Sequence, residues 1–224
     1  MTKANEMKME FMDVKFSLPF ICDEGIRPHL EKIFSGGEYE LPITFQGGYK
    51  ILDLGANCGA FALWAIHRWP GSQVTCYEPH PGIFAALTEN TKDYPEIKCH
   101  NYGIGKPGIR VLFDGPNNSG ERSFNKTLNN MTPTGAHAEV KSPLELPDAD
   151  ILKLDIEGCE LEVIEDLTKA KRSFNFILIE YHNHFIRREI DRLLIDYHLI
   201  GGEVTSPFGI GIAKYANKKV WDTP

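Results

Sequence analysis

The sequence predicts an α/β fold built on a mostly parallel sheet, with all 224 residues in a single domain. Residues 49–54 form a short apolar run typical of a buried parallel strand. Apolar residues then recur at helical spacing over 61–68, after a turn that holds Gly55 and Gly59. Strand, glycine turn and helix form the first half of a nucleotide-binding βαβ unit, where ligands bind beyond the carboxyl ends of the strands.

Later segments repeat this alternation of strands and helices. The expected core strands are residues 49–54, 73–77, 97–102, 149–156 and 174–182. The expected further helices are residues 81–91, 161–167 and 186–197. A terminal antiparallel hairpin is expected from residues 199–205 and 210–215. The chain is long enough for one sizeable core, and no break in composition marks a second domain.

Residues 1–48 are expected to form an N-terminal extension to this domain. Alternating apolar and polar residues over 9–20 predict either an edge strand with a bulge or two short strands. The amphipathic pattern over 26–34 predicts a helix that ends before Gly36. Packing against the core is the simpler role for this helix, and a cover over the ligand site is the alternative.

Residues 104–147 are expected to form an insertion. They are rich in Gly, Pro, Asn and Ser and show no helical periodicity. Residues 110–113 and 136–141 look like two short strands, which predicts a small antiparallel addition beside the ligand site.

Composition excludes several classes of protein. The formal net charge of −7 argues against a general nucleic-acid binder. The five cysteines are odd in number and favour packed free thiols in a reducing compartment. No apolar run is long enough to cross a bilayer, so the expected location is cytoplasmic, without membrane contact.

The turn after the first strand and the tip of the second carry the predicted ligand site. Glycines let a ligand approach the main chain closely, because they have no Cβ. The second strand ends in Glu78-Pro79, where a carboxylate can accept hydrogen bonds from both ribose hydroxyls of an adenosine. Asp53, near the end of the first strand, could meet a cationic amino group. The third strand ends in 101–103, where an adenine ring would rest, so Asn101 and Gly103 either touch the base or form an ordinary turn.

Polar residues at the ends of the fourth and fifth strands form a second group. Lys153, Asp155 and Glu157 share one face of the fourth strand, since side chains alternate along a strand. Glu180 and His182 share a face of the fifth strand in the same way. Buried parallel strands are expected to be apolar, so this many ionisable groups requires a reason.

Three interpretations of this second group compete. In the favoured one, Asp155, Glu180 or His182 is a general base. In the next, Lys153 neutralises Asp155 and the other polar groups cap strand ends. In the least favoured, Asp155, Glu180 and His182 bind a divalent cation that prefers oxygen ligands.

The spacing of the first motif identifies the type of nucleotide. A dinucleotide site requires G-x-G-x-x-G, whereas residues 53–59 read D-x-G-x-x-x-G. This motif, with an acid at the second strand tip, resembles the S-adenosylmethionine (SAM) site of class I methyltransferases. The pattern K-x-D-x-E-G-x-E over 153–160 resembles, more specifically, the FkbM-type branch of these enzymes, and the similarity covers about residues 50–182.

The resemblance implies a Rossmann-like seven-stranded sheet of order 3-2-1-4-5-7-6, SAM as methyl donor and usually a hydroxyl acceptor. It also assigns roles to individual positions. Glu78 would hold the ribose and Asp155 would face the reacting centre. The residues implied to cradle the methionine part are Asp53, Gly55, Asn57 and Gly59.

These observations together predict a SAM-dependent O-methyltransferase acting on a small molecule or glycan, with the insertion shaping the acceptor pocket. An RNA or protein methyltransferase is one alternative, because Lys169, Lys171 and Arg172 could form a local basic patch. A catalytically silent SAM-binding module is another. A nicotinamide-dependent dehydrogenase is disfavoured by the glycine spacing and by the lack of a Tyr-x-x-x-Lys pair.

Overall fold

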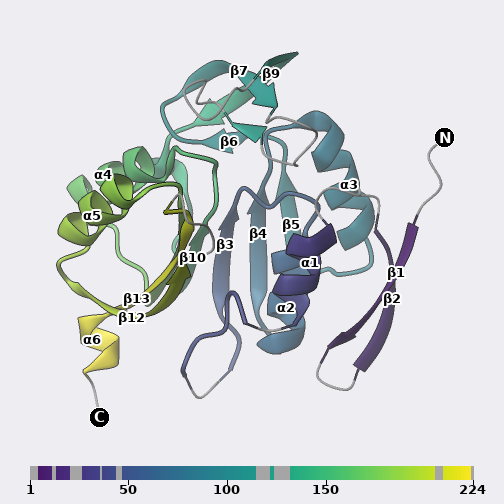
Figure 1. Cartoon of the computed structure of the whole chain (residues 1–224), viewed down its shortest axis with the longest axis horizontal. Coiled ribbons are helices and arrows are strands. Elements are labelled where there is room, and N and C mark those ends of the chain that lie inside the picture. Colours follow the sequence, from purple (N-terminus) through teal and green to yellow (C-terminus); the bar gives the residue numbers. More distant parts are fainter. Residues whose placement is uncertain are drawn as a thin grey trace.

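A computed structural model describes residues 5–11, 14–20, 27–35, 37–43, 47–114, 122–123, 132–204 and 209–222. Its centre is a seven-stranded sheet of order β12-β13-β11-β10-β3-β4-β5 (Figure 1). The strands are β3 (Lys50–Leu54), β4 (Gln73–Tyr77), β5 (Ile97–His100), β10 (Ile151–Leu154), β11 (Phe176–Tyr181), β12 (Tyr197–Val204) and β13 (Gly211–Asn217). Only β13 runs antiparallel to its neighbours β11 and β12 among these strands. Read from β5, the order is 3-2-1-4-5-7-6, which confirms the prediction.

Helices cover both faces of this sheet. They are α1 (Arg27–Phe34), α2 (Ala60–Arg68), α3 (Pro81–Thr91), α4 (Glu160–Lys169), α5 (His184–Leu193) and α6 (Lys218–Trp221). Alternate residues of β3 enter different cores, with Ile51 in the cluster under α2 and α3 and Leu52 in the cluster under α4 and α5. This alternation explains why the central strands are apolar on both sides.

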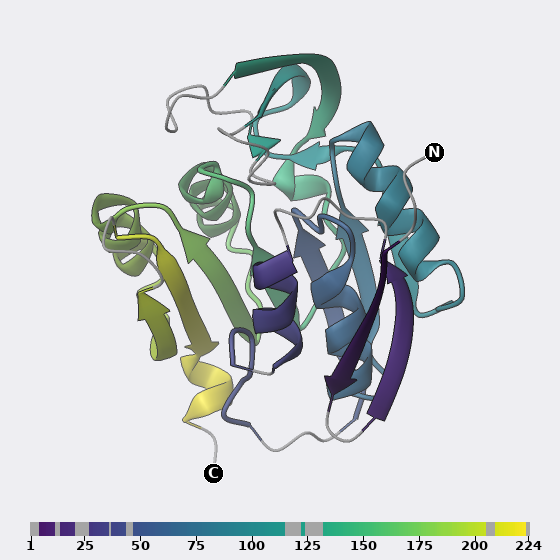
Figure 2. The same cartoon turned by 45° about the vertical axis from the view of Figure 1, so that its right-hand side comes forward.

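The N-terminal extension contains a hairpin and a helix. Strands β1 (Asn5–Phe11) and β2 (Val14–Phe20) pair antiparallel, so the alternative of two short strands is confirmed. Leu30 and Phe34 of α1 are buried in the core cluster that also contains α2 residues, which supports core packing as the role of α1. Figure 2 shows α1 beside α2, with the hairpin along the outer side of the domain.

The insertion forms a second, four-stranded sheet of order β6-β9-β7-β8. Its strands are β6 (Gly103–Ile104), β7 (Gly108–Asp114), β8 (Arg122–Ser123) and β9 (Thr132–Lys141). The predicted strands lie within β7 and β9, which pair antiparallel, whereas β6 and β8 were missed because each has only two residues. Figure 1 shows this sheet above the ends of β3, β4 and β5. A short 3-10 helix, Pro143–Glu145, leads back to the central sheet.

The main differences from the predicted elements lie at strand ends. The fourth strand was expected to reach residue 156, but β10 ends at Leu154. Glu157 and Gly158 adopt positive φ angles of 54° and 92°, so the chain leaves the sheet there. Helix α6 was missed because four residues are too few to show a periodic pattern. No helix in the described ranges has the length and apolar character needed to cross a membrane.

Candidate functional site

The turn after β3 is held against the ends of two neighbouring strands. The backbone N–H groups of Gly55 and Ala56 both donate to the Tyr77 carbonyl, at 3.0 and 3.1 Å. Gly55 has φ 77°, and a Cβ there would lie 1.8 Å from the Asp155 carbonyl oxygen. A Cβ on Gly59 would lie 2.9 Å from a methyl carbon of Leu87. Packing within the protein therefore requires these glycines, in addition to the close ligand approach that the sequence suggested.

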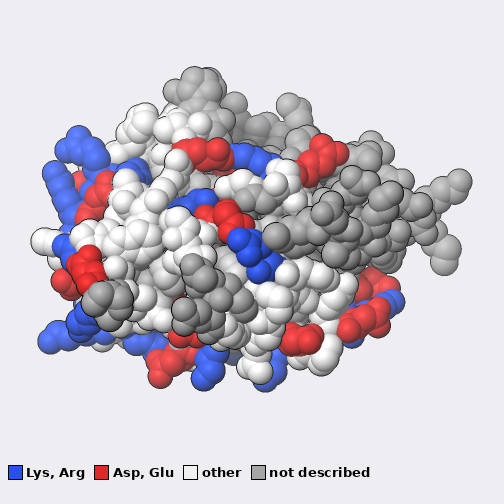
Figure 3. All heavy atoms as spheres, turned by 90° about the horizontal axis from the view of Figure 1, so that it is seen from below, with Lys and Arg blue, Asp and Glu red and all other residues white. Residues whose placement is uncertain are grey.

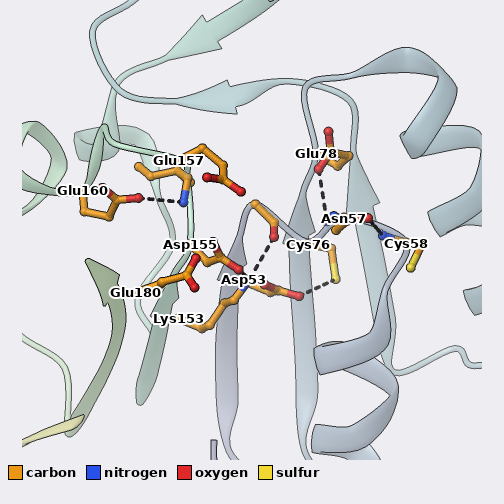
Figure 4. Close-up of polar contacts among 12 residues, drawn as sticks. Asp53, Asn57, Cys58, Cys76, Glu78, Lys153, Asp155, Glu157, Glu160 and Glu180 are labelled. Carbon is orange, nitrogen blue, oxygen red and sulfur yellow. Dashed lines mark hydrogen bonds and ion pairs between the residues drawn. The ribbon is translucent and has the colours of Figure 1, made fainter. Parts of the chain in front are cut away.

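Glu78 connects this turn to the tip of β4. Its side chain is buried, and one carboxylate oxygen accepts the N–H group of Asn57 at 3.1 Å (Figure 4). The other oxygen accepts the N–H group of His80 at 2.8 Å. Glu78 therefore fastens the turn to the tip of β4, and its carboxylate is an acceptor group of the kind to which the hydroxyls of a ligand can donate.

A crevice of about 600 Å³, counted out to its open mouth, lies between these loops and the end of β10. Its lining residues are Gly55, Asn57, Tyr77, Glu78, Pro79, Ile83, Gly103, Ile104, Asp155, Ile156, Glu157 and Cys159. The predicted cofactor positions that line it are Gly55, Asn57, Glu78, Pro79, Gly103 and Asp155. Sequence reasoning missed the apolar contributors Ile83, Ile104 and Ile156, which carry no signal distinct from ordinary core residues.

Three predicted cofactor positions lie outside this lining. Asp53 is fully buried beneath the crevice. Gly59 begins helix α2 and faces α3. The exposed Asn101 side chain donates to the carbonyls of Glu78 at 2.9 Å and Pro79 at 3.3 Å, so it supports the loop that carries Glu78.

Lys153 lies at the centre of the buried charges under the crevice. Its ammonium is 3.1 Å from the Asp53 carboxylate and 3.4 Å from that of Asp155, and it donates to the Gly55 carbonyl at 2.8 Å. Burial alone would lower the pKa of Lys153, but the two carboxylates outweigh it and raise the pKa. Burial raises the pKa of Asp53 despite Lys153. Asp155 has a lowered pKa, because Lys153 and its other partners outweigh burial. The interpretation in which Lys153 neutralises Asp155 thus describes a real contact.

The polar groups at the ends of β10 and β11 come together as the sequence indicated. The His182 Nε2 atom lies 2.9 Å from Glu157 and 3.8 Å from Glu180. Burial raises the pKa of Glu180 well above its ordinary value, and the neighbouring Asp155 raises it further. Burial likewise raises the pKa of Glu157 to about 7. Burial lowers the pKa of His182, but Glu157 and Glu160 outweigh it and raise that pKa to about 12.

Glu160 supports this group from below, a role that sequence reasoning did not assign to it. Its side chain is fully buried, and one oxygen accepts the N–H groups of Ile156 at 3.1 Å and Gly158 at 3.0 Å. These bonds hold the left-handed turn that places Glu157 at the crevice (Figure 4). The sequence showed only a favourable acid in the first turn of a helix, although the K-x-D-x-E-G-x-E pattern ends at this residue.

Comparison with known proteins identifies the family. The profile described as "Methyltransferase FkbM domain" matches residues 53–198, which include every residue of the crevice described above. The chain belongs to the FkbM methyltransferase family. This confirms the family resemblance predicted from the sequence.

Two curated relatives of this FkbM-family chain have names that describe their reactions. Hexuronic acid methyltransferase AglP of Haloferax volcanii is 30% identical over 151 residues, which cover 66% of this chain and 62% of the relative. The 2-O-methyltransferase NoeI of Sinorhizobium fredii is 26% identical over 155 residues, covering 58% of this chain and 62% of the relative. The match thus spans about three fifths of the length of each relative.

Solved structures show the same fold. An FkbM methyltransferase from Methylobacillus flagellatus has a TM-score of 0.53 at 16% identity, covering 88% of this chain and 56% of that one. Fibrillarin from Aeropyrum pernix, solved with natively bound SAM, has a TM-score of 0.55 at 14% identity, covering 96% and 84%. At these identities the likeness concerns the fold of the FkbM-family domain alone.

Proposed function

We propose that this FkbM-family protein is a SAM-dependent O-methyltransferase that acts on a hydroxyl of a sugar, either free or within a glycan. The observation that carries the proposal is the crevice itself. Its lining brings together Glu78, the Gly55 turn and the carboxylates of Asp155 and Glu157.

In this proposal the donor lies along the crevice from β4 to β10. The Glu78 carboxylate, at the tip of β4, receives the two ribose hydroxyls. The apolar side chains of Ile83 and Ile104 lie where they can contact the adenine, with Gly103 beside it. Asp155 is the carboxylate that faces the cationic end of the donor, because it lines the crevice whereas Asp53 is fully buried beneath it.

The reaction is an in-line displacement at the methyl carbon. The acceptor oxygen forms a bond to that carbon as the bond from carbon to sulfur breaks, and the donor leaves as a neutral thioether. Holding the three atoms in line supplies most of the acceleration. The proton of the acceptor hydroxyl passes to Asp155, the predicted base candidate whose pKa is lowered, and this transfer contributes more modestly. The other two candidates, Glu180 and His182, have raised pKa values and would act by orienting Asp155 and the acceptor.

The charge of this group supports a neutral acceptor. Asp155 and Glu157 line the crevice and Glu180 lies beside His182, so an acceptor atom meets carboxyl groups, to which a hydroxyl can donate and which disfavour an anion. The named activities of AglP and NoeI support a sugar as the molecule that carries this hydroxyl. A nucleic-acid acceptor is less well supported, because Figure 3 shows basic and acidic side chains interspersed over the face in view and the net charge is −7.

The test is methyl transfer from radiolabelled SAM to a panel of sugars and glycans, with RNA and protein included in the same assay. We expect transfer to a sugar hydroxyl, located by mass spectrometry of the product. Transfer to RNA or protein alone would overturn the acceptor class, and bound SAM without transfer to any class would indicate a silent binding module. Full turnover by each of Asp155→Ala, Glu180→Ala and His182→Ala would remove this group from the mechanism.

A further inference from the structure

Glu157, Glu180 and His182 form a compact set of donor atoms beside the crevice. One ligand atom from each lies within 4.8 Å of the other two. The three come from different places in the chain, namely the turn after β10, the end of β11 and the residue that follows Tyr181. Two ligands in neighbouring positions around a small divalent cation lie roughly 3 Å apart, so small side-chain shifts would allow all three to reach one ion.

We propose that Glu157, Glu180 and His182 bind a divalent cation of the Mn²⁺ type beside the methyl-transfer crevice. The cation hypothesis raised from the sequence used Asp155 in place of Glu157. The structure favours Glu157, because Asp155 is paired with Lys153 whereas Glu157 faces the His182 Nε2 atom at 2.9 Å.

A second observation, independent of the three ligand atoms, concerns the far side of the imidazole. His182 Nδ1 lies 3.7 Å from the Oε1 atom of Glu160, whose side chain is fully buried. His182 Nδ1 and the second oxygen of Glu160, Oε2, are both buried without a hydrogen-bond partner. Histidines that bind metals usually direct their other ring nitrogen to a carboxylate. Glu160 therefore stands where it would orient His182 and accept the Nδ1 proton in a hydrogen bond, while the cation displaces the proton of Nε2 to solvent.

The group is rich in carboxylates. Lys153 contacts Asp53 and Asp155, and His182 contacts Glu157, Glu160 and Glu180. Divalent cations that prefer oxygen ligands are bound where carboxylates converge. Glu157 and Glu180 keep about a fifth of their side chains exposed, at 22% and 20%, and Glu157 lines the crevice, so an ion has a route in.

The donor set indicates which cation to use. Carboxylates suit Mg²⁺, Ca²⁺ and Mn²⁺, and an imidazole suits transition metals, so a mixed set of two carboxylates and one imidazole fits Mn²⁺ with water in the remaining positions. Its role in catalysis rests on the proposed function. Next to the donor's methyl group, the cation would orient the acceptor oxygen and lower the pKa of its hydroxyl.

The experiment measures Mn²⁺ binding directly, without any turnover. The electron paramagnetic resonance signal of free Mn²⁺ is titrated with the full chain, and we expect one bound ion per chain. Glu180→Gln and His182→Gln should each weaken binding at least about 10-fold, since even a supporting carboxylate typically contributes that much. Glu165→Gln, which removes an acid on α4 with a side chain 44% exposed, is the matched control and should leave binding unchanged.

Each outcome decides the proposal. No saturable binding by the wild type, or binding equally tight in folded Glu180→Gln and His182→Gln, would overturn it. Glutamine has the shape of a protonated glutamate, so Glu180→Gln should fold. If the thermal unfolding of either variant differs from that of the wild type, Glu157→Gln is measured in its place. Glu78→Ala separates the two proposals, because it should lose SAM binding and keep Mn²⁺. A wild type that binds Mn²⁺ but not SAM would contradict the proposed function and would support the cation site.

Discussion

Replacing Lys153 by Met removes the ammonium that lies between the buried carboxylate of Asp53 and the partly exposed carboxylate of Asp155. Lys153 is 3% exposed and Asp53 is fully buried, and the two groups are 3.1 Å apart. Removing one partner of a buried ion pair costs about 3–5 kcal/mol, because the other charge is left without compensation. At about 2–4 °C per kcal/mol for a domain of this size, the midpoint of thermal unfolding should fall by roughly 6–20 °C.

The pH dependence of this loss follows from the direction of the pKa shifts. The pKa of Asp53 in the folded protein already lies above its ordinary value, and loss of Lys153 would raise it further. A group whose pKa is higher in the folded state stabilises the fold at low pH and loses that contribution as pH rises through the folded pKa. The pKa of Lys153 is raised above 10.5, so its own contribution is constant between about pH 5 and pH 8. The deficit of Lys153→Met should therefore grow with pH over this range.

Urea unfolding of the wild type and Lys153→Met at several pH values measures both quantities. Lys169→Met is the control, since its ammonium is 3.3 Å from Glu165 with a side chain 70% exposed. That surface pair should contribute less than about 1 kcal/mol. A deficit below about 1 kcal/mol for Lys153→Met, or one that shrinks as pH rises, would refute the assignment of Lys153 as the counter-ion of Asp53.

Two further predictions concern the turns that shape the crevice. Gly55→Ala places a Cβ 1.8 Å from the Asp155 carbonyl at a φ of 77°, so it should lower the unfolding midpoint by several degrees, whereas Gly37→Ala, with nothing within 4 Å of its Cβ, should change it little. Equal midpoints for the two variants would show that the turn can move away without cost. Glu160→Gln puts an amide where a carboxylate accepts two backbone N–H groups, so we expect a loss of about 1–3 kcal/mol in urea unfolding. A loss near zero would show that Glu160 does not hold the turn.

Periodicity and turn residues were sufficient to predict most of the fold. The glycine turn after β3 and the apolar runs of β10 and β11 carry strong local signals, because buried parallel strands need apolar residues on both faces. The order of the strands came from the family resemblance, and the structure confirms it. The ends of β10 were placed wrongly, since the left-handed turn at Glu157 depends on hydrogen bonds from Glu160, a contact that strand periodicity does not encode.

The sequence predicted where the candidate site lies, but not which of its charged side chains contact one another. Parallel strands end at the same edge of a sheet, so Asp155, Glu180 and His182 could be expected near Gly55. The contact between Asp53 and Lys153 could not be predicted, because it requires that β3 and β10 be neighbours with Asp53 directly opposite Lys153. The sequence suggested that Asp53 meets a cationic amino group, and in the structure the amino group beside it is that of Lys153.

The most direct test of the central claim is calorimetric titration of SAM into the wild type and Glu78→Ala. Two charge-assisted hydrogen bonds to the ribose should each contribute about 1.5–3 kcal/mol, so the dissociation constant should rise at least about 100-fold when Glu78 is removed. Saturable binding at one SAM per chain, weakened in Glu78→Ala, is the expected result. No binding by the wild type, or equal affinity in both proteins, would contradict the claim that this crevice holds the methyl donor through Glu78.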